Sequence, residues 1–264
     1  MSERYETITL ARPADDVLLV TLNRPAAANA LNTRMGLDLL DLFTEIAASP
    51  EFCRAVVLTG AGQKAFCAGG DLKERNGLTD AAWQAQHLIF ERMVKALIDC
   101  PMPLIAAVNG SAYGGGCEIA LACDFIYAAR GVRFALPEVT LGIMPGAGGT
   151  QTLPRALGEH RAKELLLTGH PFAAEDAAAW GMVNRLCDPA ALVSDAIETA
   201  SAIAANAPIA IRQAKRAMHH GLGLSLADGM LFEVEAYNRM VPTEDRREGV
   251  RAFNEKRRPV FVGR

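Results

Sequence analysis

The sequence predicts an α/β fold for about the first 150 residues and a largely helical segment after them. Short apolar stretches of strand composition alternate there with helical periodicity, a pattern typical of parallel strands joined by helical crossovers. The chain has 264 residues, half of them apolar, which is enough for a sizeable core. No low-complexity linker divides it. We therefore expect a compact core with a C-terminal helical appendage that packs on a neighbouring subunit.

The expected elements follow from composition, periodicity and end signals. β-branched and aliphatic residues predict the strands, and apolar residues that repeat every three to four positions predict the helices. Thr33 should cap the first helix and Thr79 or Asp80 the second, which Pro101 and Pro103 end. In chain order, strands are expected at 7–10, 17–22, 56–59, 104–108, 125–128, 134–136 and 183–187, and helices at 33–48, 79–99, 114–122, 159–167, 173–180, 189–206, 208–219, 224–240 and 243–256.

Charge and motif content exclude several classes of protein. The net charge of −3 argues against a nucleic-acid partner. The N-terminus lacks the apolar core of a signal peptide, and no apolar run approaches the roughly 20 residues that span a bilayer. Six scattered cysteines without a C-x-x-C pair indicate reduced thiols and a cytoplasmic location. No metal-ligand cluster, phosphate-binding Gly-Lys loop, dinucleotide motif or G-x-S-x-G elbow is present, so we expect neither a metal nor a nucleotide cofactor.

Glycine is concentrated in three windows. Twelve of the 23 glycines lie in residues 60–70, 110–116 and 142–149. The second window follows a predicted strand and opens a helix, whose first amides have no acceptor within the helix. Such amides, with the helix dipole behind them, stabilise an oxyanion. The first window could supply a second amide, although tight turns at strand ends are the simpler interpretation of each window alone.

Two carboxylates accompany these windows. Glu118 lies about one turn into the helix that starts near Gly114, and Glu138 lies between an extended segment and the third window, which we expect to fix its loop. Two carboxylates near one oxyanion hole suit general acid–base chemistry beside an enolate. Taken singly, Glu118 could be a helix first-turn carboxylate and Glu138 a neutral loop residue. Cys67 and Cys117, which lie in or beside the windows, are expected to be small apolar fillers.

The same segments closely resemble the crotonase (enoyl-CoA hydratase/isomerase) superfamily. The resemblance is carried by residues 105–110 with 114–124, 65–72, and 137–138 with 146–151, and by 23–31 and 245–249 near the ends. It implies a spiral of repeated ββα units over residues 1–195 and a C-terminal helical region over 196–264, assembled as a homotrimer or homohexamer. It also implies an acyl-CoA substrate, whose coenzyme A is part of the substrate, and no further cofactor.

The resemblance also implies roles for individual residues. The amides of Gly70 and Gly115 would bind the thioester oxygen, while Glu118 would act as base toward water at Cβ and Glu138 would give the proton to Cα. Lys256 would reach coenzyme A from the C-terminal helix, across a subunit boundary if needed, unless its basic cluster is only a solvated helix face. The expected coenzyme A contacts are Arg24, Ala26, Ala28, Ala68, Asp71, Leu72, Lys73 and Lys256.

Two departures and two alternatives qualify this interpretation. Ala26 stands where many members carry Lys, and Gly70 stands where many hydratases carry Ala, which changes the pocket shape. The favoured activity is hydration of 2-trans-enoyl-CoA to 3-hydroxyacyl-CoA. The alternatives are a Δ3,Δ2-enoyl-CoA isomerase, which typically needs only the glutamate near 138, and a catalytically silent CoA-thioester-binding scaffold. The acyl pocket should be lined by Trp83, Leu88 and Phe90 and by residues near Met144.

Overall fold

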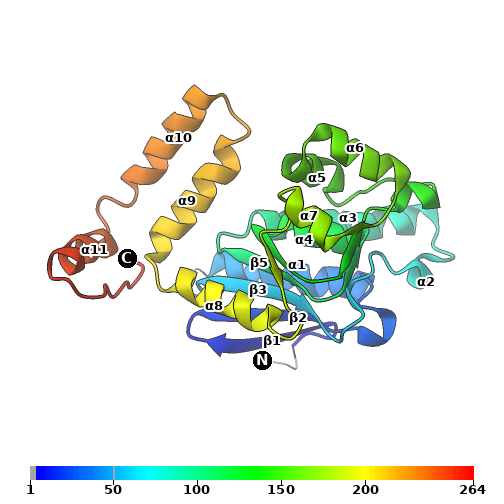
Figure 1. Ribbon diagram of the computed structural model, residues 1–264, viewed down its shortest axis with the longest axis horizontal. Coiled ribbons are helices and arrows are strands. Elements are labelled where there is room, and N and C mark those ends of the chain that lie inside the picture. Colours follow the sequence, from blue (N-terminus) through cyan, green and yellow to red (C-terminus); the bar gives the residue numbers. More distant parts are fainter. Residues whose placement is uncertain (1–3, 50) are drawn as a thin grey trace.

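The computed structural model describes residues 4–49 and 51–264 and confirms the mixed α/β architecture (Figure 1). The strands are β1 (Ile8–Ala14), β2 (Val17–Leu22), β3 (Ala55–Gly60), β4 (Ala65–Cys67), β5 (Leu104–Val108), β6 (Ser111–Tyr113), β7 (Phe125–Ala129), β8 (Arg133–Ala135), β9 (Phe172–Ala173) and β10 (Arg185–Cys187). The helices are η1 (Pro25–Ala27), α1 (Thr33–Ala48), α2 (Leu72–Arg75), α3 (Asp80–Ile98), α4 (Gly115–Ala122), η2 (Glu138–Leu141), α5 (Gly149–Leu157), α6 (Glu159–Thr168), α7 (Ala174–Ala179), α8 (Leu192–Ala204), α9 (Pro208–Gly221), α10 (Leu226–Asn238) and α11 (Glu244–Asn254).

Two sheets organise the core. The larger has the order β1-β2-β3-β5-β7-β10, and all its pairs are parallel except β1 with β2. The smaller has the order β4-β6-β8-β9. Each long strand from β3 to β7 is followed by a short strand of the smaller sheet and then by a helical segment. This is the repeated ββα pattern expected from the family resemblance.

The larger sheet is covered on both faces, as its apolar strands require. Val57 and Ile105 point toward α8 and form one apolar cluster with its alanines. Val56 and Leu58 flank Val57 in β3, so their side chains point to the opposite face of the sheet. They belong to the main core with α1 and α3. The predicted division after residue 195 falls within α8, which packs on this sheet, and it stays a prediction.

Most long elements match the predicted ranges, and the differences are local. The Asn32 side chain caps α1 by accepting a hydrogen bond from the Met35 amide, so the expected cap at Thr33 is one residue late. β1 extends to Ala14 rather than ending at residue 10. The short β4, β6, β9 and α2, and the helix α5, were not predicted. Segments of two to four residues carry too few positions for a periodic pattern, and glycines obscure the start of α5.

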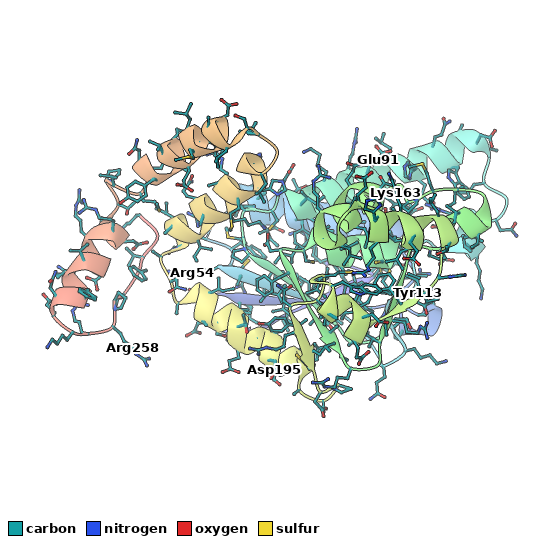
Figure 2. The ribbon with its side chains drawn as sticks, turned by 45° about the horizontal axis from the view of Figure 1, so that its top comes forward. Arg54, Glu91, Tyr113, Lys163, Asp195 and Arg258 are labelled. Atoms are coloured by element: carbon teal, nitrogen blue, oxygen red, sulfur yellow. The ribbon has the colours of Figure 1, made fainter. Side chains whose placement is uncertain are left out.

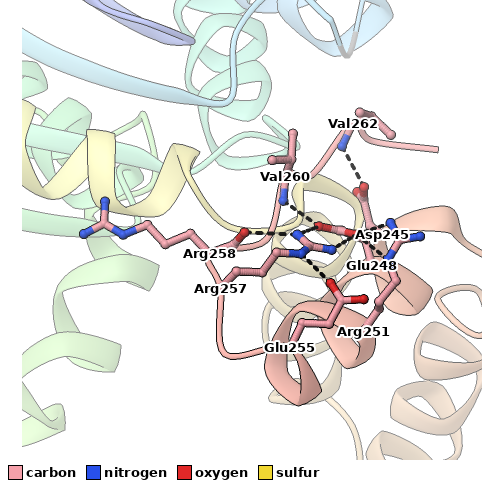
Figure 3. A network of polar contacts seen from close by, with 8 residues as sticks. All are labelled: Asp245, Glu248, Arg251, Glu255, Arg257, Arg258, Val260 and Val262. Carbon is pink, nitrogen blue, oxygen red and sulfur yellow. Dashed lines mark hydrogen bonds and ion pairs between the residues drawn. The ribbon is translucent and has the colours of Figure 1, made fainter.

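The C-terminal helices form an arm at the end of the molecule opposite α2 (Figure 1). Residues after α11 fold back against it, because Asp245 accepts hydrogen bonds from the Val262 and Gly263 amides. Glu248 accepts from Arg257 and from the Val260 amide in the same network (Figure 3). In the described part of the chain, no helix has the length and apolarity needed to span a membrane.

Candidate active site

Pairing of two short strands brings the first two glycine windows together. β4 runs parallel to β6, with Cys67 opposite Ala112, so the loops that follow these strands emerge side by side. Leu31 holds the first loop, since its amide donates to the Gly69 carbonyl and its carbonyl accepts from the Asp71 amide. A Cβ placed on Gly115 would lie 3.9 Å from the Gly70 nitrogen. The two expected oxyanion amides are therefore neighbours in space.

Glycine is required at this junction for close packing as well as for backbone conformation. A Cβ on Gly116 would lie only 2.1 Å from the Cys67 carbonyl oxygen, so any side chain there would push α4 away from the first loop. Gly114, just before α4, has φ of 52° and ψ of −125°, which an L side chain rarely adopts. The Gly70 and Gly115 amides donate no hydrogen bond to any residue that the structure describes, so both are available to a ligand oxygen.

Glu118 is buried, with 3% of its surface exposed, and is anchored from the third glycine window. Its Oε1 accepts hydrogen bonds of 2.8 Å from the amides of Ala147 and Gly149. This window therefore positions Glu118. It also closes the turn that carries Glu138, as expected, because the amides of Gly142 and Ile143 donate to the Glu138 carbonyl. Burial raises the pKa of Glu118, and the two amides act against that shift because they stabilise the ionised form. Its Oε2 carries neither of these hydrogen bonds and is left for a ligand.

Glu138 begins η2 and faces the N-terminus of α4. A Cβ on Gly114 would lie 3.1 Å from its Oε1, and its buried Oε2 has no hydrogen-bond partner in the described part of the chain. Burial raises the pKa of Glu138 to about 7, and the negative charge of Glu118 acts in the same direction. A buried carboxyl oxygen without a donor favours the protonated form, so the two glutamates have different environments.

Both glutamates and both glycines line one cavity of about 500 Å³. Trp83, Phe90 and Met144 line it as expected, but Leu88 does not, since its side chain lies on the outer face of α3 and is 45% exposed. Arg75 and His87, which were not predicted, also line the cavity. Arg75 lies two residues after the predicted contact Lys73, and His87 lies next to the predicted Leu88. Only the packing of α2 and α3 brings the side chains of Arg75 and His87 into the cavity. The remaining lining residues are Leu31, Ala68, Gly69, Leu72, Gln84, Gly114, Pro137, Leu141, Ile143, Pro145, Gly146 and Ala147.

The expected coenzyme A residues near the N-terminus surround this cavity. Ala68 and Leu72 line it, and the Ala28 carbonyl accepts a hydrogen bond from the Ala68 amide. The Arg24 guanidinium lies 2.9 Å from Asp71 Oδ2, and Asp71 in turn caps α2. Burial raises the pKa of Asp71, but the hydrogen bonds from Arg24 and from the amides of α2 outweigh it and hold the pKa below its ordinary value. This ion pair fixes the loop that carries Gly70.

The other three expected contacts lie farther out. Ala26 is in η1, next to this ion pair in sequence, and Lys73 is exposed on α2. Lys256 follows α11 in the C-terminal arm. Figure 2 shows Arg258, two residues after Lys256, in the C-terminal arm at the left, and Tyr113, which precedes the glycines of α4, in the core on the right. Lys256 of a given chain is therefore not brought to that chain's own cavity.

The thiols near the site are poor nucleophiles. Cys67 and Cys117 are fully buried, and burial raises the pKa of Cys67 to about 11 and raises that of Cys117. They pack as fillers, as expected. Over residues 4–49 and 51–264, no three His, Cys, Asp or Glu side chains are grouped so as to hold a metal ion.

Comparison with known proteins identifies the family. Residues 13–264 match the model of the enoyl-CoA hydratase/isomerase family. The chain is 48% identical over 249 residues to YngF of Bacillus subtilis, which carries the name enoyl-CoA hydratase/isomerase, and the match covers 94% of this chain and 95% of that protein. It is 40% identical to a short-chain-enoyl-CoA hydratase of Clostridium acetobutylicum, covering 92% of both. A crystal structure of an enoyl-CoA hydratase from Bacillus anthracis superimposes with a TM-score of 0.96 at 42% identity, covering 98% of this chain and 100% of that one.

Proposed function

Because the chain belongs to the enoyl-CoA hydratase/isomerase family, we propose that it hydrates 2-trans-enoyl-CoA thioesters to 3-hydroxyacyl-CoA. The observation that carries the proposal is the convergence on one cavity of two free backbone amides and two buried glutamates. An isomerase needs one carboxyl group to move a proton, whereas addition of water uses two groups, one for each end of the double bond. The presence of Glu118 beside Glu138 therefore favours hydration.

The proposed mechanism starts at the thioester carbonyl. Hydrogen bonds from the Gly70 and Gly115 amides polarise the oxygen, which makes Cβ electrophilic. Water adds to Cβ, and the electron pair moves onto the thioester oxygen to give an enolate held by the same amides. Because Gly115 is the first residue of α4, the helix dipole adds to this stabilisation. Protonation at Cα completes the addition, which needs no electron acceptor.

The environments of the two glutamates support different roles. Glu118 accepts two amide hydrogen bonds on Oε1, which stabilise its ionised form, and we assign it as the base that takes a proton from water. Glu138, whose pKa burial raises to about 7, holds a proton near neutral pH and gives it to Cα. Glu118 has two donors for its ionised form, whereas the buried Oε2 of Glu138 has none in the described part of the chain, and carboxyl groups in such different surroundings suit paired acid–base work.

Coenzyme A binding is proposed for the loops around the cavity mouth. These loops lie on two segments joined by the Ala28–Ala68 hydrogen bond and the Arg24–Asp71 ion pair, and Ala68 and Leu72 of the second segment line the cavity. The proposed contacts on these segments are Arg24, Ala26, Ala28, Ala68, Asp71, Leu72 and Lys73. We propose that Lys256 reaches the coenzyme A of another subunit in a homotrimer or homohexamer, because it lies far from the cavity of its own chain (Figures 1 and 2).

The test is loss of the conjugated enoyl-thioester absorbance with crotonyl-CoA. Glu118→Gln and Glu138→Gln keep the side-chain shape, and the amide oxygen introduced by Glu118→Gln can still accept both backbone hydrogen bonds, so the variants should fold. Each should lower kcat by about 10²- to 10⁴-fold, the usual contribution of a general acid or base. Glu164→Gln, on the exposed face of α6, is the matched control.

Three results would overturn parts of the proposal. Full activity in both glutamine variants would remove the two-glutamate mechanism. Failure of the wild type to hydrate any enoyl-CoA from short to long chain would leave a CoA-thioester-binding scaffold. Isomerisation of a 3-enoyl-CoA faster than hydration would make the protein a Δ3,Δ2-enoyl-CoA isomerase.

A further inference from the structure

Arg75 places a positive charge inside the candidate acyl cavity. It is the last residue of α2, and its guanidinium carbon lies 4.4 Å from the ring centre of Trp83 and 5.4 Å from that of Phe90. A Cβ on Gly70 would lie 3.3 Å from the same carbon. The glycine at position 70 therefore leaves room for the guanidinium directly beside the amide proposed to bind the thioester oxygen.

The described residues hold this guanidinium in place without a direct ion pair, although the charges of Glu74, Glu118 and Glu138 act on it. Nε donates a 2.9 Å hydrogen bond to Gln86 Oε1, and Gln86 is itself held by Thr33 and Glu74. The two terminal nitrogens donate to no residue in the described ranges, and no described carboxylate lies within 4.0 Å of them. Burial lowers the pKa of Arg75, yet an arginine stays charged in proteins. A half-buried, fixed and unpaired cation in a cavity is arranged for an anionic ligand.

The position of Arg75 restricts which part of the substrate it can meet. The other ionisable groups that line the cavity are Glu118, Glu138 and His87, and His87 already pairs with Glu91 at 3.1 Å. The phosphates of coenzyme A are separated from the thioester by the long pantetheine arm, whereas Arg75 lies beside the Gly70 amide. Apart from the enolate oxygen, which the Gly70 and Gly115 amides bind, the remaining part of the substrate that can carry negative charge near Arg75 is the acyl group.

We infer that the preferred substrate is a 2-enoyl-CoA whose acyl chain ends in a free carboxylate, which the terminal nitrogens of Arg75 bind. This inference rests on the proposed function, because it names the substrate class for the same cavity. A guanidinium recognises a carboxylate through two parallel hydrogen bonds. It also offsets the repulsion that the acyl carboxylate would feel from Glu118. The aromatic rings of Trp83 and Phe90 keep the guanidinium plane in one orientation.

A matched pair of substrates tests the inference. Crotonyl-CoA and glutaconyl-CoA share the reacting double bond, and the second adds a carboxylate to the terminal methyl group. We expect the wild type to favour glutaconyl-CoA in kcat/KM. Arg75→Met should lower the glutaconyl-to-crotonyl ratio of kcat/KM by about 10- to 100-fold, the usual range for a lost hydrogen bond to a charged group. Arg75→Lys keeps the positive charge but loses the planar guanidinium that makes two parallel hydrogen bonds. Its glutaconyl-to-crotonyl ratio should therefore lie between those of the wild type and Arg75→Met.

The controls separate recognition from other roles of Arg75. Arg92→Met makes the same change on the exposed face of α3 and should leave both rates unchanged. If Arg75→Met lowers kcat/KM equally for both substrates, Arg75 acts on the shared enolate and the inference is wrong. If the wild type hydrates crotonyl-CoA but shows no preference for glutaconyl-CoA, the inference is also wrong while the proposed function stands.

A binding measurement tests recognition without turnover. Glutaryl-CoA and butyryl-CoA lack the double bond and differ by the same carboxylate, so calorimetry reports recognition alone. We expect glutaryl-CoA to bind more tightly to the wild type, with the difference lost in Arg75→Met. Equal affinities in the wild type would refute the inference. Retained discrimination together with no hydration of any enoyl-CoA would refute the proposed function but leave the carboxylate site.

Discussion

Gly116→Ala tests whether contact between α4 and the first loop sets the geometry of the site. The added Cβ would lie 2.1 Å from the Cys67 carbonyl oxygen, 2.8 Å from the Cys67 carbonyl carbon and 2.8 Å from its Cβ, whereas ordinary contact begins at 3.4 Å. All three atoms belong to one residue of β4, two positions before Gly69. The substitution must therefore separate α4 from this loop.

The expected magnitude follows from these distances. Restoring ordinary contact requires a shift of roughly 1 Å, and overpacking of this kind costs about 1–3 kcal/mol. Alanine regains about 0.5–1 kcal/mol of helix propensity over glycine. The net loss of stability should be about 1–2 kcal/mol, or a fall in Tm of about 2–8 °C for a chain of this size. Because the shift separates the Gly70 and Gly115 amides, kcat/KM should fall about 10²-fold.

The assay combines thermal unfolding with hydration of crotonyl-CoA. Gly249→Ala is the matched control, since Gly249 lies in α11 and an added Cβ would meet Phe261 at 3.6 Å, an ordinary contact. The same chemical change should there raise stability by about 0.5–1 kcal/mol and leave activity unchanged. A Gly116→Ala variant with wild-type Tm and kcat/KM would refute the close-packing argument.

Two further predictions concern titration. Burial raises the pKa of Glu138 to about 7, so this carboxyl group should lose its proton as pH rises through 7, and kcat/KM should fall over the same range. The unfolding free energy should also fall between pH 4.5 and 7, because the unfolded chain loses this proton at a lower pH than the folded protein does. Glu138→Gln should reduce this pH-dependent fall in the unfolding free energy, and an unchanged pH dependence would contradict a raised pKa of Glu138. Hydrogen bonds from Arg257 and Arg251 and from the Val260 amide hold the pKa of Glu248 well below its ordinary value. The stabilisation of the folded protein by ionised Glu248 is therefore present above pH 4.5 and is lost as pH falls further. Glu248→Gln should speed hydrogen exchange at the Val260 amide more than Glu255→Gln does, and equal rates would contradict it.

The long elements were predictable because their signals are local. The range of β2 and β5 and the start of α3 at its Thr79 cap depend on residues within the element itself. The same holds for the glycines at the start of α4 and for Glu118 one turn later. The three-residue strands β4 and β6 could not be predicted in this way, because they are defined by pairing with each other across more than 40 residues.

Residue type and spacing alone were enough to predict the α/β class, the family and the two glutamates with their two glycine-rich loops. How those residues contact one another became clear only from the folded structure. It showed that the loop after Glu138 holds Glu118 through the amides of Ala147 and Gly149. It also placed Arg75 beside Gly70. Burial, ion pairing and the space left by a missing Cβ arise only when segments distant in sequence pack together, so no local pattern encodes them.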